Sequence, residues 1–189
     1  MKYCYVLSVL AIVLLLISCA PRNYLPVTEN NVERSGEYAV LRLDSSMLAA
    51  TVSFWTVEPR FLSDYYTTIS VRIQNRTSES MTIMPSDFAI IDQNNRQFDI
   101  VPTETVLEMM LLDPSLIPDR FVISAETQRE NEQRRNTIRR NILARGFSFG
   151  AVHPGAFKEG VLFFPRLDGR HQEFTLVYKG NEIKFRRSR

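Results

Sequence analysis

Few of the residue types that build metal centres, disulfide scaffolds and nucleotide-binding loops occur in this sequence of 189 residues. It has two cysteines, two histidines and seven glycines, and the glycines are spread singly along the chain. His153 and His171 do not have the spacing of zinc ligands, and no glycine-rich phosphate loop is present. Both histidines are expected in solvated loops. The sequence therefore predicts no metal ion and no cofactor, and it points to no catalytic residue.

An excess of charge of either sign is also lacking. Lysine and arginine total 23, aspartate and glutamate total 21, and the net charge is +2. This balance supplies no strong attraction to nucleic acid, so we expect no nucleic-acid partner. With 44% hydrophobic and 11% aromatic residues, the composition is that of one ordinary folded domain.

The N-terminus has the pattern of a secretory signal. Met1 and Lys2 precede an almost wholly apolar run from Tyr3 to Ile17. A helix that crosses a bilayer needs about 20 apolar residues, and this run is shorter. A basic start followed by a short apolar core is typical of a signal peptide. A tight transmembrane anchor is the alternative interpretation.

Four residues end this run in a more specific pattern. Leu16-Ile17-Ser18-Cys19 resembles the lipobox of bacterial lipoproteins. The resemblance implies a signal peptide over 1–18, cleavage between Ser18 and Cys19, and acyl chains such as palmitate on Cys19. A protein of this kind is attached to the membrane surface by its lipid and does not span the bilayer.

The resemblance also implies a location. Ala20 follows Cys19, where an aspartate would resemble an inner-membrane retention signal. Alanine therefore implies the outer membrane of a Gram-negative cell envelope, with the protein facing the periplasm. Because Cys4 would leave with the signal, the mature domain would have no disulfide, and its fold would depend on its core alone.

The rest of the chain divides by its hydrophobic period. Residues 19–37 are polar and aperiodic, which predicts a lipidated N-terminus and flexible tether. Alternation with period two then predicts an antiparallel β-sandwich over 38–185, with a hairpin turn at Asn94-Asn95 and a frayed basic tail at 186–189. The predicted strands are 38–43, 48–55, 65–74, 81–84, 88–92, 97–101, 147–152, 160–165, 174–178 and 182–185.

Two helices interrupt these strands in an insertion over 103–145. Thr103 is the predicted cap of the first helix, which is apolar nearly all round and is therefore expected to be buried. The second helix is predicted over 124–145, where Gly146 ends it. The expected fold is mainly β, an antiparallel sandwich with a two-helix insertion.

Several stretches of the domain resemble small bacterial lipoproteins with an immunoglobulin-like, or telokin-like, sandwich. The resemblance implies an interaction module of an envelope assembly, and the helical insertion departs from the plain sandwich. The stretches that carry it are 69–77, 83–88, 154–155 and 160–164, together with the final pair of strands.

The second helix is the most informative segment for function. It contains six arginines against three glutamates, and at 100° per residue the arginines scatter around it. Ile138 and Ile142 share a face that can dock the helix, whereas its first half has no apolar face. A helix that is polar all round bridges between bodies or is barely stable alone. Two interpretations therefore stay open: a solvated, fraying helix, or a projecting arm that orders against an acidic partner surface. Phosphates of lipid headgroups or of lipopolysaccharide would serve the arm equally well. Its candidate partner-binding residues are Arg134, Arg135, Arg139 and Arg140.

Two smaller features have unremarkable interpretations. Met81 and Met84 carry soft thioethers that suit Cu(I), but their spacing in a strand directs them to opposite faces. Asn75-Arg76-Thr77 matches a glycosylation sequon, and we interpret it as a turn.

The predicted function is that of a non-enzymatic envelope lipoprotein, a structural or assembly module anchored at Cys19 with an envelope protein as partner. The alternative is a lipoprotein that binds a solute, glycan or metal, for which Trp55, Tyr65 and Tyr66 are candidate stacking residues. An enzyme would require buried, perturbed carboxylates in a cleft, and no spacing in the sequence points to such a pair.

Overall fold

The computed structural model describes residues 24–29, 31–112, 125–167 and 170–188. The predicted signal peptide at 1–18, the cleavage site between Ser18 and Cys19, and the lipidation site itself lie outside the described residues.

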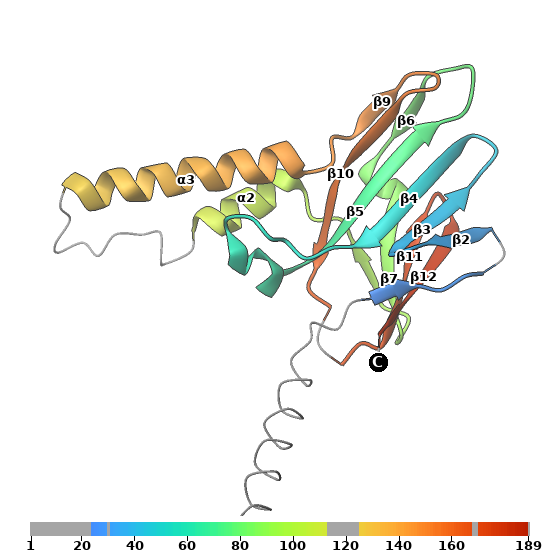
Figure 1. The fold of residues 1–189 in the computed structure, drawn as a ribbon, viewed down its shortest axis with the longest axis horizontal. Coiled ribbons are helices and arrows are strands. Elements are labelled where there is room, and N and C mark those ends of the chain that lie inside the picture. Colours follow the sequence, from blue (N-terminus) through green and yellow to red (C-terminus); the bar gives the residue numbers. More distant parts are fainter. Residues whose placement is uncertain (1–23, 30, 113–124, 168–169, 189) are drawn as a thin grey trace, which may run out of the picture.

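Two five-stranded antiparallel sheets face each other across a hydrophobic core (Figure 1). Their strand orders are β1-β12-β11-β7-β8 and β10-β5-β4-β3-β2, and a small third sheet pairs β6 with β9. The mainly β, antiparallel sandwich with a helical insertion is thus confirmed, while its immunoglobulin-like classification stays a prediction. The strands are β1 (Tyr24–Pro26), β2 (Val32–Ser35), β3 (Tyr38–Arg42), β4 (Ser46–Val52), β5 (Tyr66–Asn75), β6 (Met81–Ile83), β7 (Phe88–Asp92), β8 (Gln97–Asp99), β9 (Gly150–Val152), β10 (Phe157–Pro165), β11 (Glu173–Tyr178) and β12 (Asn181–Arg187).

Alternation along the strands builds the main core. In β5, Ile69, Val71 and Ile73 are buried between the sheets, whereas Arg72 on the other face is exposed. The hairpin between β7 and β8 turns at Asn95, whose φ of 60° is tolerated by asparagine. In β5 the period-two pattern therefore identified both the strand and its inward face.

A second, smaller core lies between the sheet that contains β10 and the helical layer. This layer consists of a 3₁₀ turn η1 (Arg60–Asp64) and the helices α2 (Thr103–Leu111) and α3 (Ala125–Arg145). The strand β10 joins the two cores, because Leu162 and Phe164 enter the main core and Phe163 enters the second. The buried members of the second core are Trp55, Leu62, Val106, Met110, Ile138, Ile142 and Phe163.

A glycine allows the chain to cross β10 after α3. At Gly160 a Cβ atom would lie 2.6 Å from the Cα atom of Phe147, closer than side chains approach a backbone. The close approach lets the Phe147 N–H donate to the carbonyl of Val161 at 3.0 Å. This contact positions the end of α3 against the sandwich.

The expectation of a tether over 19–37 and of a frayed tail at 186–189 is wrong for the described parts of both segments. β1 begins at Tyr24 and pairs with β12 along its whole length, and this pairing carries β12 to Arg187. The Tyr24 ring also packs edge-on against Phe174 at 5.1 Å. The two strands in the expected tether have three and four residues, too few to show a hydrophobic period. Long-range pairing with β12 reveals β1, and a local hairpin with β3 reveals β2.

The first helix also differs from its prediction. Pro102, and not Thr103, is the N-cap of α2, and it makes no side-chain cap hydrogen bond. Although the helix is apolar nearly all round, only one face meets the second core, so Met109 and Leu112 stay exposed. The predicted strand over 147–152 is shortened to β9, because its first residues cross β10.

Candidate interaction site

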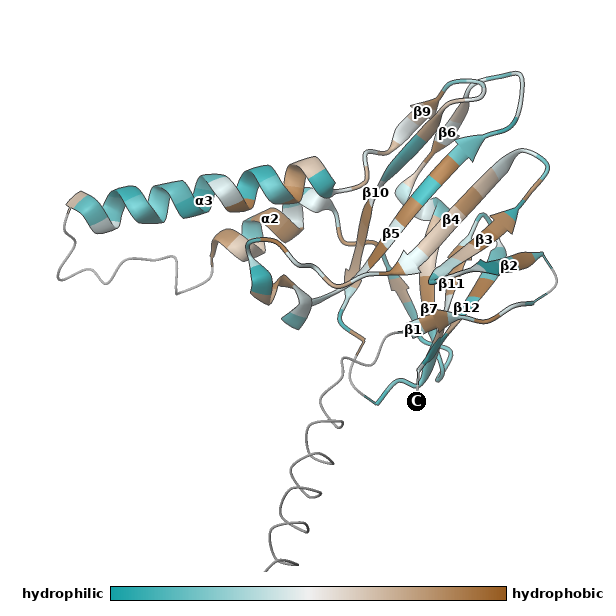
Figure 2. Ribbon diagram, viewed as in Figure 1, coloured by the Kyte–Doolittle hydropathy of each residue, from teal (hydrophilic) through white to brown (hydrophobic). Residues whose placement is uncertain are grey.

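The helix α3 projects from one side of the sandwich (Figure 1). Its 21 residues correspond to a length of about 30 Å at 1.5 Å per residue. The described residues from Ala125 to Glu130 are all exposed, and the buried side chains of the helix are Ile138 and Ile142. Figure 2 shows the same division, since most of α3 is hydrophilic and its hydrophobic residues gather near the sandwich.

Side chains from distant parts of the chain dock the second half of α3. Ile138 and Ile142 are fully buried in the second core, as the sequence predicted. The Asn141 amide donates to the Glu58 carbonyl at 2.7 Å. The Arg145 guanidinium lies 5.9 Å from the centre of the Trp55 ring, within the range of a cation–π contact. The helix is therefore fixed at one end and exposed at the other.

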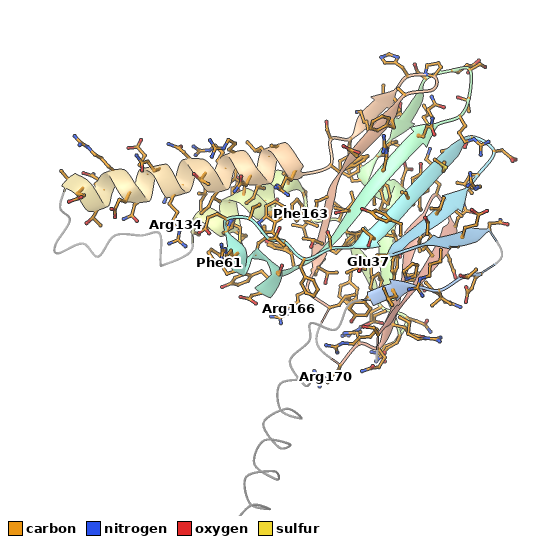
Figure 3. All side chains as sticks on the ribbon, in the orientation of Figure 1. Glu37, Phe61, Arg134, Phe163, Arg166 and Arg170 are labelled. Atoms are coloured by element: carbon orange, nitrogen blue, oxygen red, sulfur yellow. The ribbon has the colours of Figure 1, made fainter. Side chains whose placement is uncertain are left out.

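The four predicted partner-binding arginines fall into two pairs. Arg134, which is labelled in Figure 3, is half-buried. It forms an ion pair with Glu58, in which Nη2 and Nε both lie 2.9 Å from Oε1. Arg135 is also half-buried, and its Nη1 donates to the Leu111 carbonyl at 3.5 Å. Arg139 and Arg140 are exposed. The structure therefore uses the first pair to dock the helix and leaves the second pair on the surface.

This division could not be read from the sequence. Glu130 lies four residues before Arg134, the spacing of a local ion pair on a helix, but Arg134 pairs with Glu58, which is 76 residues away. Because both partners are partly exposed, the ion pair contributes little stability, on the order of 1 kcal/mol or less. Its effect is to orient the arm.

A groove borders the base of α3. It has a volume of about 500 Å³ and lies over the outer face of β4, β5 and β10. Small side chains such as Ala49 and Ser70 form its floor, while Arg72, Arg145 and Glu159 supply charge at its margin. The groove makes the surface beside the arm concave.

His171 lies in a buried polar cluster, so the expectation of a solvated loop is wrong for this residue. It is 4% exposed, and Asp92 beside it is 3% exposed. The Nε2 of His171 lies 3.1 Å from Oδ2 of Asp92, and the Arg96 guanidinium contacts the same oxygen at 2.8 Å. His153, by contrast, is exposed as expected. Only the pairing of β7 with β11 brings Asp92 and His171 together.

The Asp92 carboxylate is held in its ionised form. Burial by itself would raise its pKa, but hydrogen bonds from the backbone N–H groups of Arg96 and Asn94 and from the side chains of His171 and Arg96 outweigh burial. The pKa of Asp92 therefore lies well below its usual range. Five donor atoms contact the two oxygens, which have about four lone-pair sites between them. The carboxylate thus has no capacity left for a substrate, and the cluster ties the β7–β8 hairpin to β11.

We expect this cluster to make the fold sensitive to acid. A carboxylate with a lowered folded-state pKa contributes stability above its ordinary pKa of about 3.9, and the contribution is lost as the pH falls toward the native value. The free energy of unfolding of the native protein should fall steeply below about pH 4. Asp92→Asn should lower stability at about pH 7 and flatten this acid dependence.

Urea unfolding at several pH values measures this effect. Asp44→Asn is the matched control, because Asp44 is exposed in a turn and its neutralisation should leave the pH profile unchanged. Equal profiles for Asp92→Asn and the native protein would contradict the structural role of the cluster.

Two smaller features of the sequence, the methionine pair and the glycosylation sequon, have plain structural explanations. Met81 packs against the main core whereas Met84 is 52% exposed, so the two thioethers do not converge. Asn75 of the sequon is fully buried, and its Nδ2 donates to the carbonyls of Glu79 and Val152, which confirms the turn.

The three candidate stacking residues for a ligand lie in different settings. Trp55 is 6% exposed and belongs to the second core, and the Tyr66 ring packs against Phe163 at 6.4 Å. Tyr65 is half-exposed and contacts the Phe61 ring. Core packing therefore accounts for two of the three.

A Gly-x-Ser-x-Gly pattern that the sequence reasoning missed spans 146–150. In hydrolases this motif places a nucleophilic serine on a sharp turn from a strand into a helix. Here the order is reversed, because α3 precedes the motif and β9 follows it. Ser148 is exposed and makes no hydrogen bond to either histidine within the described chain. The context is therefore not that of a nucleophile elbow.

In residues 24–29, 31–112, 125–167 and 170–188, no helix combines the length and apolar character needed to cross a bilayer. Over the same part of the chain, no three histidine, cysteine, aspartate or glutamate side chains gather as a metal site would require.

Comparison with known proteins gives no further assignment. No protein-family model, no curated protein and no solved structure matches this chain.

Proposed function

We propose that this chain is a non-enzymatic, lipid-anchored interaction module of a bacterial cell envelope, attached through Cys19 to the outer membrane and facing the periplasm. The sandwich serves as the rigid body, and α3 is the arm that contacts an acidic surface of an envelope protein. The lipobox-like sequence before Cys19 supports the anchor.

The observation that carries the proposal is the exposed half of α3. A helix gains most of its stability in a protein by burying an apolar face, and the described residues from Ala125 to Gln133 bury none. They nevertheless continue the helix from its docked end for more than two turns. Contact with a second body would repay the conformational entropy of ordering this segment.

The charges of the arm favour an acidic partner. Arg129, Arg139 and Arg140 are exposed, and their planar guanidinium groups match carboxylates in two-point hydrogen bonds. Arg134 and Arg135 contact Glu58 and Leu111 and are therefore assigned to docking the helix.

Site-specific photo-crosslinking in envelope membranes tests the proposal. A photoreactive amino acid at the exposed Glu132 should form an adduct with a partner, whereas the same label at Glu79, on the sandwich, should not. Arg129→Glu, Arg139→Glu and Arg140→Glu together should reduce the Glu132 adduct at least about tenfold, because like charges across an interface repel.

A second charge reversal is the matched control. Arg42→Glu, Arg76→Glu and Lys179→Glu change the net charge equally at exposed positions of the sandwich away from the arm, so the adduct should persist. The proposal fails if Glu132 forms no adduct, or if both triple variants lose the adduct to the same extent.

A further inference from the structure

The helices α2 and α3 lie side by side and run in opposite directions (Figure 1). The start of α2 meets the end of α3, because a Cβ atom at Gly146 would lie 2.7 Å from the side chain of Thr103. The end of α2 lies beside the middle of α3, where the Arg135 guanidinium donates to the Leu111 carbonyl at 3.5 Å. Both helices therefore form the outer surface of the helical layer over the docked half of α3.

The charged faces of the two helices lie on the same side of this layer. At 100° per residue, Glu108 is opposite Val106 and Met110, the side chains that α2 buries in the second core. By the same spacing, Arg140 is opposite the two isoleucines that α3 buries there. Glu108 and Arg140 thus both project away from the second core.

The exposed strip of α2 is acidic and apolar, and it comprises Glu104, Glu108, Met109 and Leu112. Glu104 and Glu108 are four residues apart, a spacing at which like charges destabilise a helix. In the described parts of the chain, neither carboxylate forms an ion pair. Met109 is 50% exposed and Leu112 is 66% exposed. The strip therefore offers negative charge and apolar surface to a second body.

The exposed strip of α3 beside it is basic, and it comprises Arg139, Arg140 and Leu143. Arg139 donates to the Asn136 side chain at 3.2 Å, and neither arginine forms an ion pair within the described residues. The sequence of α3 has no acidic residue after Glu132, so nothing on the helix offsets these charges locally. The acidic strip of α2 and the basic strip of α3 are complementary in charge, and each includes an exposed leucine.

We propose that a second copy of this chain covers both strips, so that α2 of each copy packs against α3 of the other. A twofold axis that runs parallel to the helices, between the two copies, brings each acidic strip over a basic strip. The strips meet at the same level, because α2 lies beside the half of α3 that carries the arginines. This contact gives every exposed charge of the two strips a partner of opposite sign.

The proposal rests on the proposed function for the role of Arg139 and Arg140 as contact residues, and it names the acidic surface that they meet. With nine residues in α2, the contact is a small one. Two copies anchored in one membrane would gain from a high effective concentration, which favours a contact of this size.

Charge exchange between two differently tagged copies of the full chain tests the proposal. Both copies are co-expressed, and capture of one tag from detergent-solubilised envelope membranes measures the other copy. Glu104→Arg with Glu108→Arg makes both strips basic, whereas Arg139→Glu with Arg140→Glu makes both strips acidic. When both tagged copies carry the same variant, co-capture should fall at least about tenfold, because like charges then face each other.

Co-expression of one copy of each variant is the decisive measurement. Every acidic strip then meets a basic strip again, so co-capture should return. Arg42→Glu with Arg76→Glu, at exposed positions of the sandwich, is the matched control and should leave co-capture unchanged. Absence of co-capture for the native chain, or a loss that the mixed variants do not restore, would overturn the contact.

Photo-crosslinking of the otherwise native chain gives a measurement that does not depend on the folding of these variants. A photoreactive amino acid at Glu108 should form an adduct with a second copy, and mass spectrometry should map the adduct to 136–143. Adducts that map only to other parts of the second copy would overturn the proposed arrangement.

The outcomes also separate this contact from the proposed function. Loss of self-association together with a Glu132 adduct to a different envelope protein would overturn the second copy as partner and leave the arm proposal standing. Self-association without any Glu132 adduct would support the contact between α2 and α3 and overturn the arm proposal.

Discussion

Phe163→Ala should lower the free energy of unfolding by about 3–5 kcal/mol, the range for truncating a buried phenylalanine. Phe163 is 1% exposed, and its ring contacts those of Trp55 at 5.8 Å and Tyr66 at 6.4 Å. It projects from β10 toward the helical layer, whereas its neighbours Leu162 and Phe164 enter the main core. Its removal would leave a cavity between the sandwich and the helices.

Denaturant unfolding followed by tryptophan fluorescence measures this loss. Trp55 is the only tryptophan in the sequence and lies in the second core, so its emission reports the packing around Phe163. Phe157→Ala on the same strand is the control, because Phe157 is 48% exposed and should cost less than about 1 kcal/mol. Similar losses for the two variants would mean that the second core contributes little to stability.

Ile142→Ala should release α3 from the sandwich while the strands stay folded. Ile142 is fully buried and belongs to the second core, and truncating such a residue costs about 2–5 kcal/mol. The main core contains no residue of α3, so the loss of stability should affect α3 before it affects the strands. Undocking would also separate Arg134 from Glu58 and leave the arm without a defined direction.

Hydrogen exchange resolved by residue checks this localisation. Amides of α3 should lose protection in Ile142→Ala, while those of β11 and β12 should keep it. Leu143→Ala is the control, because Leu143 is adjacent in the sequence but 48% exposed. Uniform loss of protection in both sheets would show that the two cores unfold as one unit. If α3 is the partner-binding arm, Ile142→Ala should also reduce the Glu132 adduct.

Local patterns determined much of the fold. The alternation of Ile69, Val71 and Ile73 identified the inward face of β5, because period two places such residues on one side of a strand. Ile138 and Ile142 are four residues apart, a spacing that places both on one face of a helix, and this identified the docking face of α3. Asn94-Asn95 indicated the hairpin turn through the backbone preference of asparagine, which the φ of Asn95 confirms.

Tertiary structure alone decided the contacts between distant segments. The pairing of Arg134 with Glu58 and of His171 with Asp92 joins residues more than 70 positions apart, and no local pattern predicts such pairs. The strand β1 exists because β12 offers it an edge, and three residues are too few to show a period. The spacing of apolar residues in the sequence therefore determined which face of each strand or helix is buried. Which polar groups are buried, and which charged groups meet, depended on the distant segments that the sheets bring together.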